Sequence, residues 1–443
     1  MLITNATLIT WDSPNQILEN QALHLEKNKI AYAGPSSELE ARYPSAEKLD
    51  ARGQLVMPGG ICAHTHFYGA FSRGMTIPGN APKDFPEILE KLWWPLDKSL
   101  LEDDIRYSAL LCLVDAIKHG TTTLIDHHAS PNFIDGSLDT IAETVERAGI
   151  RAALCYEVTD RDGEAKMKAG IDENLRFIKK DKGPLLAGTF GLHASLTLSD
   201  STLDLCRQTV PDDTGFHVHA AESEADEWDS LNKSGLRVID RLHKHGILGP
   251  KTITAHCVHV DAREIGLLAD TGTWVTHQPR SNMNNAVGVA PVESMLRAGV
   301  NVCLGNDGFS NAMWEEWKAA YLVHKVWHHD PRRMNGYDVT QLAIYNNAAL
   351  ANVFFPDAPI GQITPGAFAD LIFVDYHAPT PLTPGNLPWH ILFGFQQSMV
   401  TTTIVGGEVL MKDRELITLD EAEIAVKAKE LATNVWSRYE EKF

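Results

Sequence analysis

The sequence predicts an α/β fold, a (β/α)8 barrel of the TIM type joined to a small β-sandwich domain. Eight strand-like apolar runs alternate with longer helical stretches between residues 58 and 357. Eight βα units in series are typical of a closed parallel barrel. Short alternating strands near both ends of the chain predict the second domain.

The first 57 residues contain three short strand-like stretches, "MLITNATLITW", "ALHLEKNKIAYAG" and "KLDARGQLVMPG", separated by Gly, Asn and Asp. This texture returns after residue 358 in "IGQITPGAFADLIFVDY" and "TTTIVGGEVLMKD", and an amphipathic helix follows, "LDEAEIAVKAKELATNVWSRYEEKF". We therefore expect residues 1–57 and 358–443 to form one composite β-sandwich domain beside a barrel of residues 58–357.

The helical stretches between the barrel strands, such as "EDDIRYSALLCLVDAIKHG", end at a glycine, as helices often do. An open doubly wound sheet would show the same alternation. Eight units and the absence of GxGxxG after the first strand favour the barrel. The predicted strands are "GGICAHTH", "TTTLIDHH", "RAALCYEV", "LLAGTFGLHA", "GFHVHAAE", "TITAHCVHV", "TWVTHQP" and "NVCLGNDG".

The charge excludes two classes of partner. With 39 basic and 58 acidic residues the formal net charge is −19. Nucleic acids and anionic membranes need a basic face, so neither is expected as a partner. The expected partners are a small heterocyclic substrate and a second copy of the chain in a homodimer.

The cysteines and the N-terminus indicate a cytoplasmic protein. The six cysteines form no CxxC pair, and Cys62, Cys155, Cys257 and Cys303 lie in strand-like runs. Buried free thiols in a reducing compartment explain this better than disulfides. No charged segment followed by an apolar one opens the chain, and no apolar run reaches 18 residues.

Ionisable residues gather where the predicted strands end, which is where the active sites of such barrels lie. A single histidine in an apolar strand is more often a packed core residue than a ligand. Histidines at most of the strand ends indicate a converging site instead. The residues are His64, His66, Asp126, His127, His128, His193, His217, His219, Glu222, His256, His259, His277, Arg280 and Asp307.

The predicted metal ligands are His64, His66, His219 and Asp307. His64 and His66 are two apart, so a strand points both imidazoles to one side. Three neutral imidazoles and a carboxylate suit one divalent metal, zinc or alternatively iron, with a position left for water. Such a metal gives hydroxide at neutral pH, so Asp307 also belongs to the catalytic set.

Two further residues are candidates for proton transfer. Glu222 lies three residues after His219 in "HAAE" and is placed to act as a general acid and base. A carboxylate stabilised by the dipole of a helix N-terminus is the plain structural alternative. His256, one strand on, orients the nucleophile or polarises the atom that receives charge.

Three residues are candidates for binding a flat substrate. Arg280 is suited to an anionic group or a carbonyl edge, or alternatively makes a structural salt bridge. Trp93 stacks on a ring or packs in the core, and His128 touches the substrate or caps a loop. If Arg280 binds, an oxidised purine or a pterin fits better than an adenosine derivative.

In this order, "PGGICAHTH", "HVHAAE", "AHCVHV", "HQPRSN" and "LGNDG" resemble the motifs of the amidohydrolase superfamily. They are similar to its branch of adenosine-type, guanine and triazine deaminases and chlorohydrolases. Within the branch, "FYGAFSRGM", "LWWPLDKSL", "DHHASP" and "HQPRSNMNN" resemble the SsnA-type aminohydrolases, which are associated with purine-catabolic gene sets.

The resemblance implies the same four metal ligands, with Glu222 and His256 as catalytic partners and His193 in contact with substrate. It implies a single metal, because "GLHAS" stands where binuclear relatives carry a lysine. The implied reaction is deamination of a purine- or pterin-like heterocycle with release of ammonia. Hydrolysis of a cyclic amide, an amidine or a carbon–halogen bond is the alternative reaction, and an inactive binding scaffold is a third hypothesis.

Overall fold

The computed structural model describes residues 1–443 and places the eight predicted runs in two parallel sheets, which isolated bridges join into a ring. The fourth run is divided at Thr189 into two short strands, β9 and β10. The strands are β6 (Gly60–Thr65), β7 (Thr121–Asp126), β8 (Arg151–Leu154), β9 (Leu186–Gly188), β10 (Phe190–Ala194), β11 (Phe216–Ala220), β12 (Ile253–His256), β13 (Trp274–His277) and β14 (Val302–Leu304).

The ring closes where the chain beyond β14 meets β6. Thr65 pairs with Asp307 in a parallel bridge, and the Asn306 amide donates to the His64 carbonyl at 3.0 Å. A Cβ atom at Gly305 would lie 2.8 Å from the backbone nitrogen and oxygen of His64. Only glycine therefore permits this close approach, which brings Asp307 next to His64 and His66.

Helices surround the ring, and the predicted barrel is confirmed. Their apolar faces pack on the outer side of the strands in the largest cluster of buried residues. The helices from the barrel region are α2 (Phe85–Ile88), α3 (Trp94–Asp97), α4 (Glu102–His119), α5 (Ser137–Ala148), α6 (Glu164–Lys179), α7 (Asp200–Thr209), α8 (Glu224–Ser234), α9 (Val238–Lys244), α10 (Ala262–Thr271), α11 (Pro279–Asn284), α12 (Val292–Arg297), α13 (Met313–His328), α14 (Gly336–Thr340) and α15 (Asn347–Phe354).

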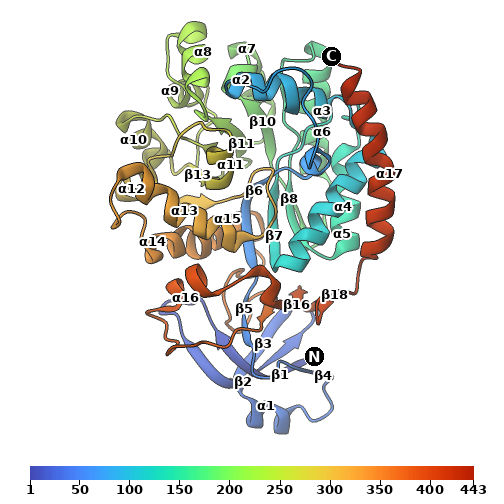
Figure 1. The fold of residues 1–443 in the computed structure, drawn as a ribbon, viewed down its shortest axis with the longest axis vertical. Helices are drawn as coiled ribbons and strands as arrows, with labels where there is room; N and C mark the ends of the chain where they lie inside the picture. Colours follow the sequence, from blue (N-terminus) through green and yellow to red (C-terminus); the bar gives the residue numbers. More distant parts are fainter.

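Both ends of the chain contribute to one further sheet, below the barrel in Figure 1. β5 joins the two contributions, since it pairs with β1 on one side and antiparallel with β15 on the other. The strands are β1 (Leu2–Ile9), β2 (Ile17–Glu26), β3 (Lys29–Pro35), β4 (Lys48–Asp50), β5 (Leu55–Pro58), β15 (Leu371–Val374), β16 (Val400–Val405), β17 (Glu408–Lys412) and β18 (Glu415–Leu416).

Three helices belong to the terminal segments, α1 (Ser36–Arg42), α16 (Leu387–Gly394) and α17 (Glu421–Glu440). α17 does not stay with the terminal sheet but runs along the barrel beside α4 (Figure 1). Lys118 of α4 pairs with Glu421 at 2.7 Å, and the Trp436 indole donates to the Phe71 carbonyl at 2.8 Å. The last helix therefore packs against the outside of the barrel and connects the C-terminal segment to it. No helix of the chain is long and apolar enough to cross a membrane.

Candidate metal centre and active-site pocket

Four of the predicted residues meet at one point at the carboxyl ends of the barrel strands. The Nε2 atom of His66 lies 3.1 Å from the Nε2 atom of His219 and 2.9 Å from Asp307 Oδ1. His64 Nε2 lies 3.5 Å from the same Asp307 oxygen. Ligand atoms about 2.0–2.1 Å from a tetrahedral zinc are roughly 3.3 Å from one another. The spacing therefore fits four ligands of one ion.

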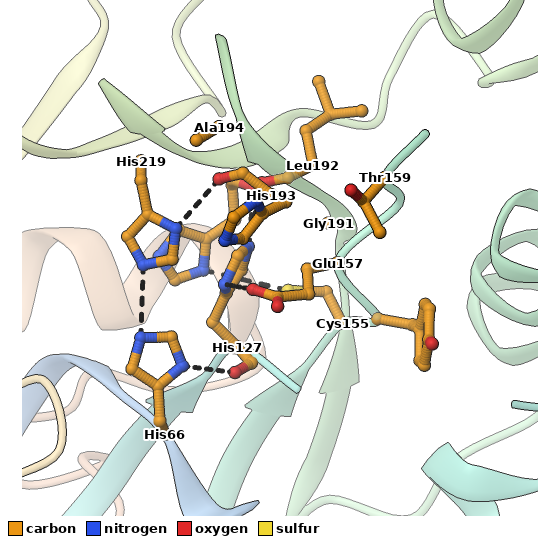
Figure 2. Close-up of polar contacts among 12 residues, drawn as sticks. His66, His127, Cys155, Glu157, Thr159, Gly191, Leu192, His193, Ala194 and His219 are labelled. Carbon is orange, nitrogen blue, oxygen red and sulfur yellow. Dashed lines mark hydrogen bonds and ion pairs between the residues drawn. The ribbon is translucent and has the colours of Figure 1, made fainter. Parts of the chain in front are cut away.

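The other ring nitrogen of each of the three histidines already has a partner. His66 Nδ1 lies 2.6 Å from the His127 carbonyl, and His219 Nδ1 lies 2.8 Å from the His193 carbonyl (Figure 2). His64 Nδ1 lies 2.8 Å from His217 Nε2. A proton held on Nδ1 leaves the Nε2 lone pair free for a metal, as at most histidine metal sites. His64 Nε2 is buried without any hydrogen-bond partner, which points to an ion as its missing partner.

Burial sets the charge of these imidazoles. It lowers the pKa of His64 to about 3 and holds the pKa of His219 well below its usual range, so both rings are neutral. Burial also opposes protonation of His66, but the hydrogen bond with Asp307 raises its pKa to about 9. Asp307 thus attracts positive charge to the point where the Nε2 atoms meet.

Glu222 and His256 lie beside this cluster. Glu222 Oε2 is 3.4 Å from His256 Nε2, and burial together with the charges of Asp307 and Asp226 raises the pKa of Glu222 well above its usual range. The Asn282 amide donates to His256 Nδ1 at 2.9 Å, so the neutral ring carries its proton on Nε2. This Nε2 atom is buried without a hydrogen-bond partner and lies within 4.8 Å of the ligand atoms of His64, His219 and Asp307, so it faces the candidate metal centre.

The backbone turns sharply at or next to three of the predicted site residues. His256 and Asp307 adopt the left-handed backbone conformation, with φ of 75° and 57°, as does Ala221 just before Glu222, with φ of 49°. Residues other than glycine rarely adopt it, and such strain is concentrated at active sites. Glu222 precedes α8, whose N-cap is Ser223, so it lies outside the helix and is not simply a first-turn carboxylate.

A cavity with about 580 Å³ of space, part of it open to solvent, lies over the cluster. Seven of its 16 lining residues are apolar, four of these are aromatic, and the other nine are polar. The apolar side chains are Tyr68, Phe85, Leu89, Trp93, Trp94, Ala194 and Leu196, and the polar ones are His66, Asp97, Glu157, His193, His219, Glu222, Asp226, Asn285 and Asp307.

Two of the four predicted substrate-binding residues line this cavity and two do not. Trp93, at the end of the short π-helix η2 (Leu89–Trp93), and His193 are in the lining. His128 is fully buried outside it, with Nε2 2.8 Å from the Ser130 hydroxyl. Arg280 is not in the lining either, so its placement does not support contact with substrate.

The Arg280 guanidinium instead joins two helices. It lies at the start of α11 and pairs with Glu316 and Glu315 of α13, and it also donates to the Ser310 carbonyl. Burial raises the pKa of Glu316 to about 7, although Arg280 opposes this shift. This arrangement matches the structural alternative considered for Arg280.

We expect Arg280→Met to lower the free energy of unfolding by about 3–5 kcal/mol, because it leaves the fully buried Glu316 without its cation. Urea unfolding of the variant and of Arg332→Met, whose side chain is exposed, measures the effect. An unchanged stability together with a raised KM for the best substrate would return Arg280 to the binding role.

Three functional candidates were not predicted as site residues. Asp97 and Glu157 line the cavity, and Asn285 donates to Glu222 at 3.4 Å. Asn285 lies in "HQPRSNMNN", and Glu157 lies near the end of the predicted run "RAALCYEV", where the strand-end rule could have found it. Asp97 had no such signal, since it comes from α3 outside the strand pattern.

Comparison with known proteins identifies the family to which the chain belongs. A barrel that gathers histidines and an aspartate at its strand ends defines a class of metal-dependent hydrolases. The model of the amidohydrolase family matches residues 55–410. The chain belongs to the amidohydrolase family. The resemblance inferred from the motifs is thereby confirmed, and so is the expectation of a hydrolase acting on carbon–nitrogen bonds.

Similar curated proteins cover nearly the whole chain. A 5-methylthioadenosine/S-adenosylhomocysteine deaminase of Pelotomaculum thermopropionicum is 30% identical over 99% of both chains. A 5'-deoxyadenosine deaminase of Methanosarcina mazei is 31% identical over 99% of both. A zinc-bound adenosine deaminase of Xanthomonas campestris shares the fold, with a TM-score of 0.84, 23% identity and coverage of 98% of both chains.

Proposed function

We propose that the protein is a zinc-dependent deaminase of an aminopurine, with an adenosine-type nucleoside as its substrate and purine catabolism as its role. The observation that carries the proposal is the meeting of three histidine Nε2 atoms and the Asp307 carboxylate beneath a cavity that also holds Glu222. Iron is the alternative metal, because it accepts the same ligands.

Different residues of the site would bind the metal, transfer protons and donate a hydrogen bond to the nucleophile. His64, His66, His219 and Asp307 would hold a zinc or iron ion, which would lower the pKa of a water molecule toward about 7 and so supply the nucleophile. Burial raises the pKa of Glu222 well above its usual range, which suits it to protonate a ring nitrogen and to pass the proton of water to the departing ammonia. His256 donates from Nε2 to the oxygen that attacks the ring carbon.

Two observations support an adenosine-type substrate over an oxidised purine or pterin. Arg280, the residue on which the preference for an oxygen-rich ring depended, pairs with Glu315 and Glu316 outside the cavity. The similar proteins that cover the whole chain are named for adenosine derivatives. The flat indole of Trp93 suits stacking on the base.

The test is a release assay on metal-loaded enzyme. We expect ammonia from adenosine and 5'-methylthioadenosine, with kcat/KM at least about 10-fold above guanine and pterin, a difference of about 1.4 kcal/mol in transition-state binding. A preference for guanine or pterin would restore the oxidised-ring hypothesis. Chloride release from a chlorotriazine without ammonia from any amine would assign the chlorohydrolase reaction instead.

We also propose that two chains associate and that the protein works in the reducing cytoplasm. Leu322 and Val326 lie on one face of α13, with Trp327 beside them and Phe393 against Tyr321, and these four apolar side chains are exposed. Such a patch suits a protein interface. A monomeric mass in light scattering would contradict the dimer. All six cysteines are buried and free, which suits a reducing compartment.

A further inference from the structure

The cavity is acidic on one wall, where the Glu157 carboxylate lies within 4.8 Å of ring nitrogens of His193 and of the proposed metal ligand His219. Of its 16 lining residues none is lysine or arginine, whereas Asp97, Glu157 and Asp226 are carboxylates in addition to Glu222 and Asp307. Asp226 is occupied, because it accepts the backbone amides of Glu222 and Ser223. Asp97 and Glu157 remain as acceptors that face the cavity.

The backbone holds Glu157 rigidly. Its amide donates to the His128 carbonyl at 2.8 Å, and the next residue, Val158, donates to Gly191 at 3.1 Å. The segment after β8 is thereby fixed between the ends of β7 and β10, and its carboxylate lies beside His127 and His193 (Figure 2). A side chain on such a rigid segment is well placed to discriminate between ligands.

Burial opposes the charge of Glu157, but His193, His127 and Arg161 lower its pKa to about 2, so the carboxylate is ionised, yet one of its oxygens lacks a hydrogen bond. Its side chain is 2% exposed, and Oε2, although 3.1 Å from His127 Nδ1, has no hydrogen-bond partner. Oε1 is 3.8 Å from Arg161 Nη2, beyond hydrogen-bond distance. A buried carboxylate normally accepts several hydrogen bonds, so a ligand in the cavity is the natural source of the missing donors.

Asp97 lies on the same wall. Its Oδ2 accepts from Arg161 Nη2 at 2.8 Å, but its buried Oδ1 has no partner. Arg161 is itself outside the lining, with its guanidinium 5.1 Å from the centre of the Trp94 ring. Burial raises the pKa of Asp97 to about 7 although Arg161 opposes this shift, so Glu157 is the firmly ionised carboxylate on this side of the cavity.

We propose that Glu157, supported by Asp97, selects substrates that present N–H, O–H or ammonium donors to this wall and rejects substrates that carry a carboxylate or a phosphate there. This deepens the proposed deamination and rests on it. An anionic group at this wall would lose its hydration and face a carboxylate of the same sign, which is strongly unfavourable. Glu157 is thus a specificity residue for this site.

The test uses three nucleosides that differ only at the 5' carbon: 5'-deoxyadenosine, 5'-amino-5'-deoxyadenosine and adenosine-5'-carboxylate. On metal-loaded enzyme we expect kcat/KM for the amine and the neutral nucleoside to exceed that for the carboxylate by a factor on the order of 10². In Glu157→Gln the ratio of amine to carboxylate should fall at least about 10-fold, and Asp97→Asn should lower it independently.

Glu164→Gln is the matched control, because Glu164 is exposed seven residues further on and should leave the ratio unchanged. Bound metal and thermal unfolding of each variant establish that it is folded. A ratio that Glu157→Gln and Asp97→Asn leave unchanged, or a carboxylate that reacts as well as the amine, overturns the inference.

Binding separates this inference from the proposed reaction. Calorimetry on metal-loaded Glu222→Gln ranks the same three nucleosides without turnover. The expected order with no ammonia from wild-type enzyme would refute the deamination and support the acidic selection. Tighter binding of the carboxylate, or no binding of the amine, overturns the selection whatever the reaction is.

Discussion

Glu222→Gln lowers turnover by a factor of about 10²–10⁴, the usual contribution of a general acid and base, while the metal stays bound. Glutamine has the same shape as glutamic acid and keeps the contact with Asn285, but its amide acts neither as an acid nor as a base at neutral pH. The loss should appear in kcat, since the proton moves only during the reaction.

Glu224→Gln provides the comparison for this variant. Glu224 opens α8 two residues later and is exposed, so its amide should support normal turnover. Steady-state kinetics and elemental analysis of both variants decide the outcome. Near-normal turnover of Glu222→Gln with a full metal content would remove Glu222 from the mechanism.

His219→Ala and Asp307→Ala are expected to lose the metal or hold it far more weakly. Wild-type protein should contain about one zinc or iron per chain, and each substitution removes one of four ligands. Asp307 has the larger effect of the two, because it is the only anion among the four and lies within 3.5 Å of two of the histidine nitrogens. Activity should fall with metal content in both variants.

Elemental analysis after dialysis measures this effect, and His377→Ala is the control, since that side chain is almost fully exposed and distant in sequence from the strand ends. Two variants that both keep a full complement of metal would show that the ligands are assigned wrongly. Retention in Asp307→Ala alone would restrict the error to the carboxylate.

The barrel was predictable because its signals are local. Each strand is a short apolar run, and each helix has its own periodicity and terminal glycine, so no distant contact is needed to recognise the unit. The meeting of His64, His66, His219 and Asp307 follows from one added rule, that parallel strands end at the same edge. The sequence could not show that α17 leaves the terminal sheet, because its amphipathic face fits either surface.

The contacts around the pocket depend on how distant segments pack together, which the spacing of residues in the sequence does not show. Arg280 and Glu316 are 36 residues apart, and only the packing of α11 on α13 brings them together. The polar residues of the segment "YEVTD", which contains Glu157, are also typical of a surface loop. Glu157 is buried because bridges to β7 and β10, distant in sequence, hold the segment at the cavity.

The pairing of β5 with β15 has a consequence for synthesis on the ribosome. Pro58 lies opposite Leu371, so 371 − 58 = 313 residues separate partners in the same sheet. Ribosomes add about 5–20 residues per second, so β15 is synthesised roughly 16–63 s after β5. During this interval an apolar strand edge is open to other nascent chains. We therefore expect the barrel to fold first and the yield to depend on chaperones that cover this edge.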